Sequence, residues 1–592
     1  MKETLDARRL CWLALALLVA FAYLGGLEAP FVYDDKVEVI GNATIRVLDR
    51  WQAIATYNPS RLLLILSYAL NYHFSELDPL PYHVVNLAIH GLAVGAALAF
   101  AEAVGRLARH PRPLGAALIG VGLWAVHPMG TQAVTYITGR SESLCALFCL
   151  SSLGLWAGAL LEERATGRLD LGSRALALLA ALAALLSKEV GLVLPGALLA
   201  LELFFPSRGQ GSVGPAPLSA RLRALRWGLF LPLVLLVVAA VLGHMHGWTG
   251  GDDAQKGSSS LFDLPLLPHE VNRPLDVQLL TQAEVWLRYV GLWLLPLGQT
   301  VFHVIPDAVP GSARATAALA GWLVMIGAGA LWGRRRPLVG FALLCGALFL
   351  IPSSSVAPLK ESMAEHRAYL LGLFLSLALC WGLSAPAGPR PRERALRDRR
   401  MVQVGVFLLG LLPFLTAARQ QTWSSEVALW KEATLRDPSS ADAWYGLGDA
   451  QRFQGRFGPA MDAYRRAADL NPDNLDAWNN LGIARAELGD AEGAADAWRT
   501  LLRHSPTYCK AHNNLGFLAL RRREWDLAEV ELNTTLAYCA DNVLAHWGLG
   551  NIYYGPRRDT QKALYHYQRV LDLDPDFEHA PEIRQRLLEL TW

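Results

Sequence analysis

Long apolar runs alternate with short polar segments through the first 416 residues, and this pattern predicts a helical membrane domain. The first run, Leu10 to Leu27, is long enough to span a bilayer, which takes about 20 residues. A cleaved signal peptide ending at Ala20-Phe21-Ala22 is the alternative, but the many apolar runs that follow favour an uncleaved anchor. The further predicted spans are Tyr82–Gly105, Leu114–Val126, Ser143–Leu161, Ala175–Leu186, Val190–Phe205, Trp227–Gly243, Ala315–Gly333, Leu338–Ile351, Tyr369–Leu383 and Val402–Thr416. The prediction is a bundle of about eleven transmembrane helices.

Two apolar segments are not predicted to cross. The stretch Ala283–Leu297 is rich in aromatic and cationic residues, such as Trp286 and Arg288, and is predicted to be re-entrant or interfacial. The stretch Arg61–Phe74 is too short to span and is predicted to lie on the membrane surface.

Basic clusters between the runs indicate the topology, because cytoplasmic loops collect Lys and Arg. The clusters are Arg106/Arg109/Arg112, Arg164/Arg168/Arg174, Arg208/Arg221/Arg223/Arg226, Arg334 to Arg336 and Arg390 to Arg400. With the N-terminus inside, all of them fall on the cytoplasmic side. The same parity predicts that the last third of the chain lies outside the cytoplasm.

That last third carries an internal repeat. Four related segments recur 34 residues apart, the period of tetratricopeptide (TPR) repeats, and begin at Trp444, Trp478, His512 and His546. Each is followed by a small and an aromatic residue, as at Ala460 and Tyr464. The predicted domains are a membrane domain over residues 1–420 and a TPR α-solenoid over residues 421–592, so the whole chain is predicted to be all-α.

Composition supports this division and excludes several classes of protein. The chain is 53% hydrophobic and 18% charged, with a mean hydropathy of +0.25, which is high for a soluble protein. A formal net charge of +2 argues against a nucleic-acid partner. Seven cysteines without a CxxC pair give no zinc or redox motif. Cys509 and Cys539 flank the third repeat, and either a disulfide or two buried thiols would fit them.

Several polar motifs are predicted on the non-cytoplasmic face, where acid, base and cation together suit sugar transfer from a lipid phosphate. Asp34 and Asp35 follow the first span, and adjacent carboxylates raise one another's pKa, which suits one of them to proton abstraction; a solvated loop is the plain alternative. The remaining candidates, assigned to donor-phosphate or substrate binding, are His127, Arg140, Glu142, Lys188, Glu189, Glu365, His366 and Arg367.

Each of these candidates has a structural alternative. His127 precedes a proline and fits a helix-terminal histidine equally well, and Lys188 with Glu189 fits an interfacial ion pair. Arg140 and Glu142 are predicted to pair with each other or with the donor, and Arg367 to face a lipid phosphate. No metal site is predicted, since the scattered ligands of one outer loop lack a tight spacing and favour a flexible loop: His244, His246, Asp252, Asp253 and His269.

The order of these motifs resembles the transmembrane and TPR-containing O-mannosyltransferases, the TMTC family. The matching segments are FVYDDKVEVIGN (31–42), LSYALNYHFSELDPLPYHVVNLAIH (66–90), AVHPMGTQAVTYITGRSE (125–142), SKEVG (187–191), WLRYVGLWLLPLG (286–298), PSSS (352–355) and ESMAEHRAYL (361–370). The resemblance covers nearly the whole chain, although the array of about four repeats is shorter than in many relatives.

The resemblance implies a GT-C membrane fold, a polyprenyl- or dolichyl-phosphate sugar as donor, typically mannose, and protein Ser or Thr hydroxyls as acceptors. It implies that Asp34 or Asp35 is the catalytic base and that the TPR array binds the acceptor protein. No cofactor is predicted beyond this donor, and a metal requirement stays open. The predicted mechanism is direct displacement with inversion at the anomeric carbon, since one base and one leaving-group clamp suffice.

Two alternatives remain at the level of sequence. One is a related enzyme that acts on a glycan acceptor, and the other is a non-catalytic membrane scaffold that recruits partners through the repeats. The predicted location is a bacterial inner membrane with periplasmic repeats, or alternatively the ER membrane with luminal repeats.

Overall fold

The computed structural model describes residues 2–205, 273–333, 335–352, 361–384 and 391–591, and it divides into two compact units, Met1–Leu429 and Trp430–Trp592. The described residues form helices and no strand, which confirms the all-α prediction. Four predictions lie outside the described residues: the span Trp227–Gly243, the Arg208–Arg226 cluster, the outer-loop histidines with their aspartates, and positions 353–355 of the PSSS segment.

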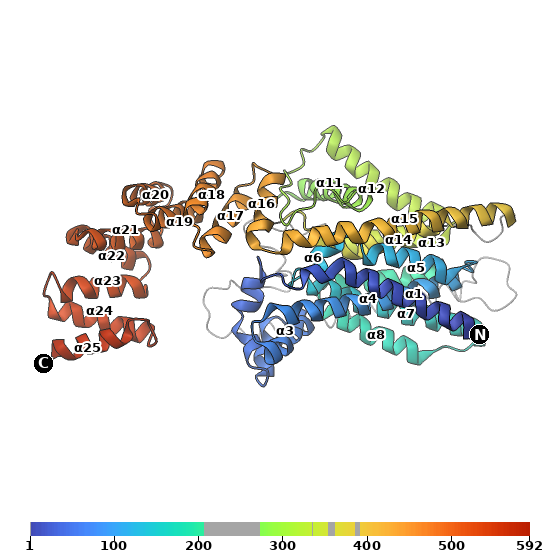
Figure 1. Cartoon of the computed structure of the whole chain (residues 1–592), viewed down its shortest axis with the longest axis horizontal. Helices are drawn as coiled ribbons and strands as arrows, with labels where there is room; N and C mark the ends of the chain where they lie inside the picture. Colours follow the sequence, from blue (N-terminus) through green and yellow to red (C-terminus); the bar gives the residue numbers. More distant parts are fainter. Residues whose placement is uncertain (1, 206–272, 334, 353–360, 385–390, 592) are drawn as a thin grey trace. The chain divides into compact units, whose positions relative to one another are not determined.

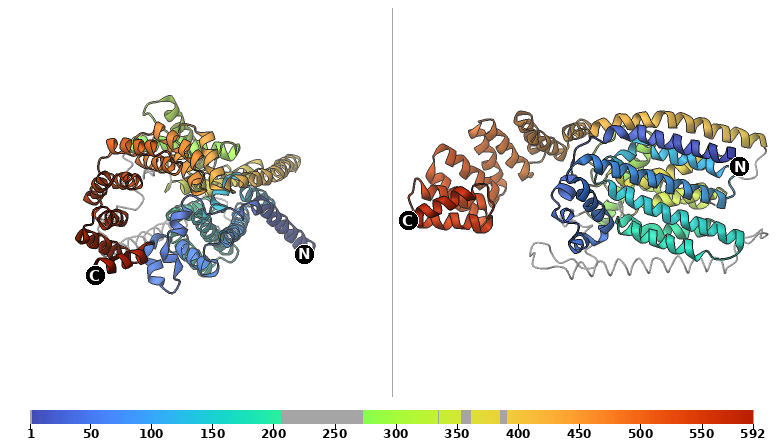
Figure 2. Two further views of the ribbon diagram at one scale, coloured as in Figure 1. Left: turned by 60° about the vertical axis from the view of Figure 1, so that its left-hand side comes forward. Right: turned by 60° about the horizontal axis from the view of Figure 1, so that its bottom comes forward.

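The first unit is a bundle whose long helices run side by side (Figures 1 and 2). These helices are α1 (Lys2–Tyr23), α4 (Pro79–Leu107), α5 (Pro113–Ala125), α7 (Arg140–Thr166), α8 (Leu171–Leu185), α9 (Leu194–Phe204), α11 (Leu275–Leu294), α12 (Ala313–Trp332), α13 (Pro337–Leu350), α14 (Tyr369–Leu383) and α15 (Pro391–Trp423). Shorter elements connect them: η1 (Leu24–Gly26), η2 (Lys36–Ile40), η3 (Ala43–Arg46), α2 (Trp51–Tyr57), η4 (Pro59–Arg61), α3 (Leu62–Ser75), η5 (Pro128–Gly130), α6 (Thr131–Val134), η6 (Glu189–Val193) and η7 (Glu365–Ala368).

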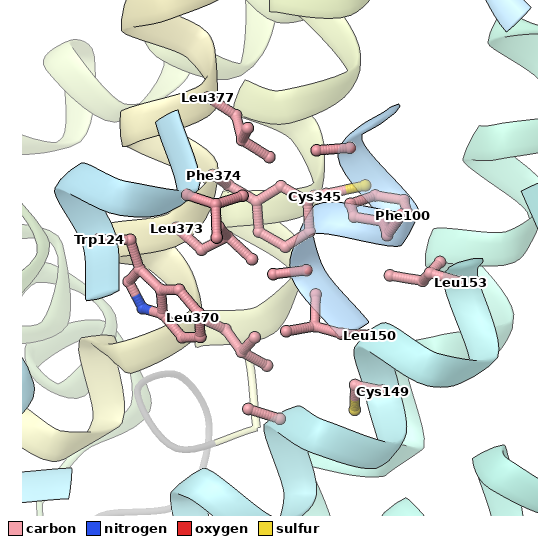
Figure 3. Packing of buried hydrophobic residues seen from close by; sticks show 14 of the residues in the cluster. Phe100, Trp124, Cys149, Leu150, Leu153, Cys345, Leu370, Leu373, Phe374 and Leu377 are labelled. Carbon is pink, nitrogen blue, oxygen red and sulfur yellow. The ribbon is translucent and has the colours of Figure 1, made fainter. Parts of the chain in front are cut away.

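The bundle core consists of apolar side chains from at least five helices. Figure 3 shows Phe374 and Leu377 of α14 packed among Phe100 of α4, Leu150 of α7 and Cys345 of α13. Helices whose own sequence is apolar all round need such partners, or lipid, on every side. This is why the predicted apolar runs coincide with the helices of the bundle.

Several of these helices meet the length and hydropathy expected of a membrane span. The described residues contain five such helices, and a sixth candidate if the pair Pro113–Ala125 and Pro128–Val134, bent by 58°, is one span. The five are Arg9–Gly26, Pro79–Leu107, Arg140–Thr166, Glu365–Leu383 and Ala395–Trp423. Leu171–Leu185, Ala313–Gly329 and Pro337–Leu350 are shorter apolar helices. The count of about eleven spans therefore stays a prediction.

Members of two predicted basic clusters lie at the end of this bundle opposite to the polar motifs. At what we term the basic end, Arg164 on α7 donates a hydrogen bond to the carbonyl of Leu107, where α4 ends (2.6 Å). Arg336, before α13, donates to the carbonyl of Gly382, where α14 ends (2.5 Å). The other end, where α4, α7 and α14 begin, we term the motif end, because it carries Asp34, Asp35 and the other candidate residues.

Helix α11 begins at the motif end, and the loop that follows it returns to the same end. Arg273, just before α11, hydrogen-bonds Ser362 (3.2 Å), and the loop after α11 comes back to donate from Thr300 N to Glu365 (2.8 Å). Arg314 at the start of α12 pairs with Glu284 of α11 (2.8 Å). Whether this segment is re-entrant or interfacial stays a prediction.

The short helix α3 packs on one side into the motif end. Ile65 and Tyr68 are buried against residues of η3 and α2, whereas Leu70 and Phe74 remain exposed. An amphipathic helix of this kind suits the predicted surface position.

The second unit contains four antiparallel helix pairs, preceded by α16 (Glu426–Arg436) and followed by α25 (Ala580–Thr591). The pairs are α17 (Ala441–Phe453) with α18 (Phe457–Leu470), α19 (Leu475–Glu487) with α20 (Ala491–His504), α21 (Cys509–Arg522) with α22 (Trp525–Tyr538), and α23 (Val543–Tyr554) with α24 (Thr560–Leu573). They confirm the predicted solenoid.

The glycines of the repeat motif explain how closely the helices pack. A Cβ atom on Gly448 would lie 2.7 Å from the ring of Tyr464, and one on Gly482 would lie 2.3 Å from Nε1 of Trp498. Each large aromatic of a second helix thus needs the bare backbone of the first. A disulfide joins Cys509 and Cys539, which resolves the pairing that the sequence left open.

Candidate functional site

The loop after α1 holds its two aspartates in different environments. Asp35 is fully buried, and its carboxylate oxygens accept hydrogen bonds from Val32 N (3.0 Å) and Thr138 N (2.8 Å). Burial raises the pKa of Asp35 to about 7, against the opposing effect of these hydrogen bonds. Asp35 therefore connects the loop to the segment before α7.

Asp34, in contrast, is exposed. Its backbone N–H donates to the Tyr136 hydroxyl (2.9 Å), and its carbonyl accepts from Glu38 N (2.8 Å). The main chain on both sides of Asp34 is thus fixed while its carboxylate faces outward. Of the two predicted bases, Asp34 is the one whose side chain an incoming molecule can reach.

Glu38 lies within electrostatic range of both this carboxylate and Arg61. Burial raises the pKa of Glu38, the positive charge of Arg61 lowers it, and the negative charge of Asp34 raises it again. Arg61 ends η4 and forms an ion pair with Glu189 (3.3 Å). The first loop, η4 and η6 therefore meet at one charged surface.

Lys188 and Glu142 form a buried ion pair. The Lys188 Nζ lies 2.7 Å from the Glu142 carboxylate and 3.4 Å from Ser141 Oγ. Lys188 and Glu189 are thus not paired with each other, as their adjacency suggested, but with partners from α7 and η4. The turn at Lys188 needs Gly191, because a Cβ there would lie 2.7 Å from the amide nitrogen of Leu185.

Arg140 does not pair with Glu142 and does not reach the surface. Its guanidinium is fully buried and donates to Asn86 Oδ1 (2.6 Å), the Tyr82 carbonyl (3.0 Å) and the Ser67 carbonyl (3.2 Å). It also lies 4.9 Å from the centre of the Tyr68 ring. Arg140 therefore joins α3, α4 and α7, and this placement corrects the predicted pairing.

The ring nitrogens of His127 are likewise hydrogen-bonded within the chain. Its Nδ1 accepts from Met129 N (3.2 Å), and its Nε2–H donates to the Trp293 carbonyl (3.0 Å). Both ring nitrogens are used at the break between α5 and η5. This geometry favours the helix-terminal alternative.

The segment Glu365-His366-Arg367 contributes three different side chains. Glu365 is buried and accepts from Thr300 N (2.8 Å) and His303 Nε2 (2.9 Å). His366 lies within range of the positive charges of Lys188, Arg367 and Arg61, and its Nδ1 has no hydrogen-bond partner among the described residues. Glu365 thus supports the loop, while His366 belongs to the charged surface.

Arg367 is anchored from the other side of the site. Its Nη1 donates to the Glu361 carbonyl (2.8 Å), and the Glu361 carboxylate accepts from the Tyr33 hydroxyl. His366 thus lies within electrostatic range of Lys188, Arg367 and Arg61, and Arg61 pairs with Glu189, whereas Arg140 and His127 are held by hydrogen bonds within the bundle; a shared role in substrate binding stays a prediction. Within the described residues, no group of three or more His, Cys, Asp or Glu is suited to hold a metal ion.

Sequence reasoning missed Arg61, Glu38 and Tyr136 as members of the site. The apolar pattern marks Arg61 only as the start of a short stretch, although a cation at the edge of a predicted surface helix is itself a signal. Glu38 lies within the segment that contains Asp34, and Tyr136 within the segment before α7.

Comparison with known proteins identifies both parts of the chain. Three tetratricopeptide-repeat family models match residues 441–474, 463–495 and 513–576. Human protein O-mannosyl-transferase TMTC1 is 25% identical over 79% of this chain and 57% of its own length, and mouse TMTC3 is 24% identical over 76% of this chain and 50% of its own length. Along most of its length the chain is similar to the TMTC proteins.

Other similarities are more local. Drosophila melanogaster Tmtc1 is 32% identical, but over only 32% of this chain and 23% of its own length. Among solved structures, the TPR protein YrrB covers 33% of this chain and 94% of its own, with 18% identity and a TM-score of 0.24. The chain spans about half the length of the curated relatives that it matches along most of its sequence.

Proposed function

We propose that this chain is a membrane glycosyltransferase of the GT-C class, which transfers mannose from a polyprenyl- or dolichyl-phosphate donor to Ser or Thr hydroxyls of proteins. The observation that carries the proposal is an exposed carboxylate, Asp34, at the end of the helical bundle where Arg61, Lys188 and Arg367 gather around His366, with Glu38 in range of both Asp34 and Arg61. The relatives named as protein O-mannosyl-transferases support the reaction type.

The chemistry assigns a role to each part of this surface. Asp34 accepts the proton of the acceptor hydroxyl as its oxygen attacks the anomeric carbon, and the bond from that carbon to the phosphate oxygen breaks. The phosphate leaves with the electron pair and gains charge, which Arg61, Lys188 and Arg367 stabilise. His366 Nδ1 provides a further hydrogen bond to the phosphate, and the product is inverted at the anomeric carbon.

The remaining predicted residues act through these groups. Glu142 and Glu189 orient Lys188 and Arg61 through their ion pairs. Asp35 fixes the loop that carries Asp34, and Glu365 fixes the loop after α11. Arg140 and His127 hold the helices from which the site is built.

We place the site and the repeats on the non-cytoplasmic side. Two features support this side: Arg164 and Arg336, from two of the predicted cytoplasmic clusters, lie at the bundle end remote from the site, and the repeats contain a disulfide, which persists in oxidising compartments. A bacterial periplasm and an ER lumen both satisfy these conditions.

Purified full-length protein in proteoliposomes provides the test. Radiolabelled polyprenyl-phosphate mannose is supplied with either a Ser/Thr-containing peptide or an oligosaccharide. We expect transfer to the peptide, with loss of that transfer in Asp34→Asn. Transfer to the oligosaccharide alone would favour a glycan-modifying enzyme, and transfer to neither acceptor would favour a scaffold.

A further inference from the structure

The backbone just before Asp34 has an unusual conformation. Tyr33 has a φ of 52°, in the left-handed region that a bulky residue rarely adopts. Such a conformation costs free energy and persists only where the surrounding structure holds it. The contacts that hold this loop therefore decide where the Asp34 carboxylate lies.

One support of the loop comes from the end of α15. The Asp34 N–H donates to the Tyr136 hydroxyl (2.9 Å), and the Tyr136 ring stacks on Trp423, the last residue of α15 (5.6 Å between ring centres). Gln420, one turn earlier on α15, accepts a hydrogen bond from the Thr135 hydroxyl (2.7 Å). Gln420 and Trp423 are each 1% exposed, so this support belongs to the packed interior.

A second support comes from the start of α16. Lys36, two residues after Asp34, forms an ion pair with Glu426, the first residue of α16 (2.6 Å). The Lys36 and Glu426 side chains are 33% and 16% exposed, so the pair lies near the surface rather than in the core. The boundary between the two compact units follows Leu429, which places Glu426 in the same unit as the loop.

We propose that Glu426, through its ion pair with Lys36, positions the loop so that the Asp34 carboxylate can take the proton of the acceptor hydroxyl. Glu426 is thus a positioning residue of the transferase site, on the helix that leads into the repeats. This inference rests on the proposed function, since it takes Asp34 as the base. Proton transfer depends on precise geometry, and a displacement of about 1 Å can lower a rate about 10²-fold.

Positioning differs in its consequences from a purely structural role and from direct action on the substrate. A surface ion pair contributes little to stability, because water and salt screen both charges. Loss of the pair should therefore lower the rate while leaving thermal unfolding almost unchanged. A lysine that acted directly on the donor phosphate would also be needed for the rate, but it could not be exchanged with its partner. Exchange of the two charges therefore distinguishes positioning from direct action.

The test uses the full-length protein in proteoliposomes with radiolabelled polyprenyl-phosphate mannose and a Ser/Thr-containing peptide. We expect Glu426→Lys and Lys36→Glu each to lower kcat about tenfold, with the KM for the donor changed by less than about twofold. The double variant, in which the two charges are exchanged, should recover most of the lost kcat. In all three variants Tm should change by no more than about 2 °C.

Glu102→Lys provides a matched control. Glu102 pairs with Arg106 on α4 at the basic end, and its side chain is 12% exposed, close to the 16% of Glu426. The same charge reversal there should leave kcat unchanged. Full kcat in Glu426→Lys, no recovery in the double variant, or an equal loss of kcat in Glu102→Lys would each overturn the inference. A fall in the Tm of Glu426→Lys large enough to account for its lost activity would overturn it as well.

Amide hydrogen exchange of residues 31–42 measures the loop without any transfer reaction. We expect exchange about threefold to fivefold faster in Glu426→Lys and in Lys36→Glu, and a wild-type rate in the double variant. If the wild type transfers no mannose but these exchange rates hold, only the proposed function fails. If Asp34→Asn loses transfer while Glu426→Lys keeps its kcat and its exchange rate, only this inference fails.

Discussion

Substitution by asparagine should affect different properties at the two adjacent aspartates of the first loop, the transfer rate at Asp34 and the stability of the fold at Asp35. Asp34→Asn removes an exposed carboxylate, whereas Asp35→Asn alters a buried one that accepts two main-chain hydrogen bonds. Both substitutions keep the size of the side chain and remove one negative charge. Each variant therefore controls for the change in charge and size made by the other.

For Asp34 the expected effect is on the rate. An amide cannot accept the proton of the acceptor hydroxyl, and loss of a general base lowers kcat by about 10²- to 10⁴-fold, which is about 3–5 kcal/mol. Since the side chain is exposed, the free energy of unfolding should change by about 1 kcal/mol or less.

For Asp35 the expected effect is on stability. Asparagine offers only one oxygen, so either Val32 N–H or Thr138 N–H would face the amide NH₂ group, at a cost of about 1–3 kcal/mol and a few degrees in Tm. The pKa of about 7 also predicts the sign of a pH effect. The protonated form is favoured in the fold, so the stability that it contributes is fully present below about pH 4 and is lost as the pH rises through 7. Asp35→Asn should remove this slope.

Transfer per folded molecule and thermal unfolding in detergent, measured for both variants, would check these expectations. Full transfer by Asp34→Asn would remove Asp34 as the base. A loss of transfer in Asp35→Asn without any change in Tm would mean that Asp35, not Asp34, acts on the substrate.

The other predictions concern the supports of the site and its sidedness. Lys188→Met should lower the free energy of unfolding by about 3–5 kcal/mol, because it leaves Glu142 buried and unpaired. Adding Glu142→Gln should restore much of the lost stability. A double variant that unfolds at the same temperature as Lys188→Met would contradict the pairing. Gly191→Ala should lower the free energy of unfolding by about 1–3 kcal/mol, because its Cβ would meet the backbone of α8. The control Gly158→Ala places its Cβ in open space and should leave the stability unchanged. Equal Tm values for the two variants would argue against the close approach at Gly191. In intact cells the cysteines of the repeats should react with maleimide only after reduction, and labelling without reductant would contradict an oxidising compartment. Replacing both cysteines by serine should lower the free energy of unfolding by about 2–4 kcal/mol.

Much of the fold could be predicted from the sequence, because it depends on local patterns. Apolar runs of sufficient length became helices, and the 34-residue period became four helix pairs. The number of spans could not be obtained in this way. Leu171–Leu185 and Pro337–Leu350 are shorter than a bilayer requires, and only their surroundings decide whether they cross.

The site was harder, because partners distant in the sequence decide where each side chain points. Adjacency suggested the pairs Lys188 with Glu189 and Arg140 with Glu142, yet successive residues face different directions. The ion pairs are instead Lys188 with Glu142 and Glu189 with Arg61. Likewise, nothing in the sequence distinguishes Asp34 from Asp35, since the distinction comes from Thr138, on a different segment.

Buried polar groups in this bundle fall into two physical classes, and the difference indicates which ones act on a substrate. Arg140, His127 and Asp35 have their hydrogen-bonding atoms matched by the protein, so a ligand would have to displace those bonds. His366 Nδ1 in the bundle and Asn513 Oδ1 in the repeats are buried without a partner among the described residues. An unmatched buried atom calls for an explanation, and a water molecule or a ligand can supply the missing bond. Since Ser152 Oγ and Trp381 Nε1 also lack a partner among the described residues, an unmatched atom indicates a substrate only where it adjoins the site, as His366 Nδ1 does.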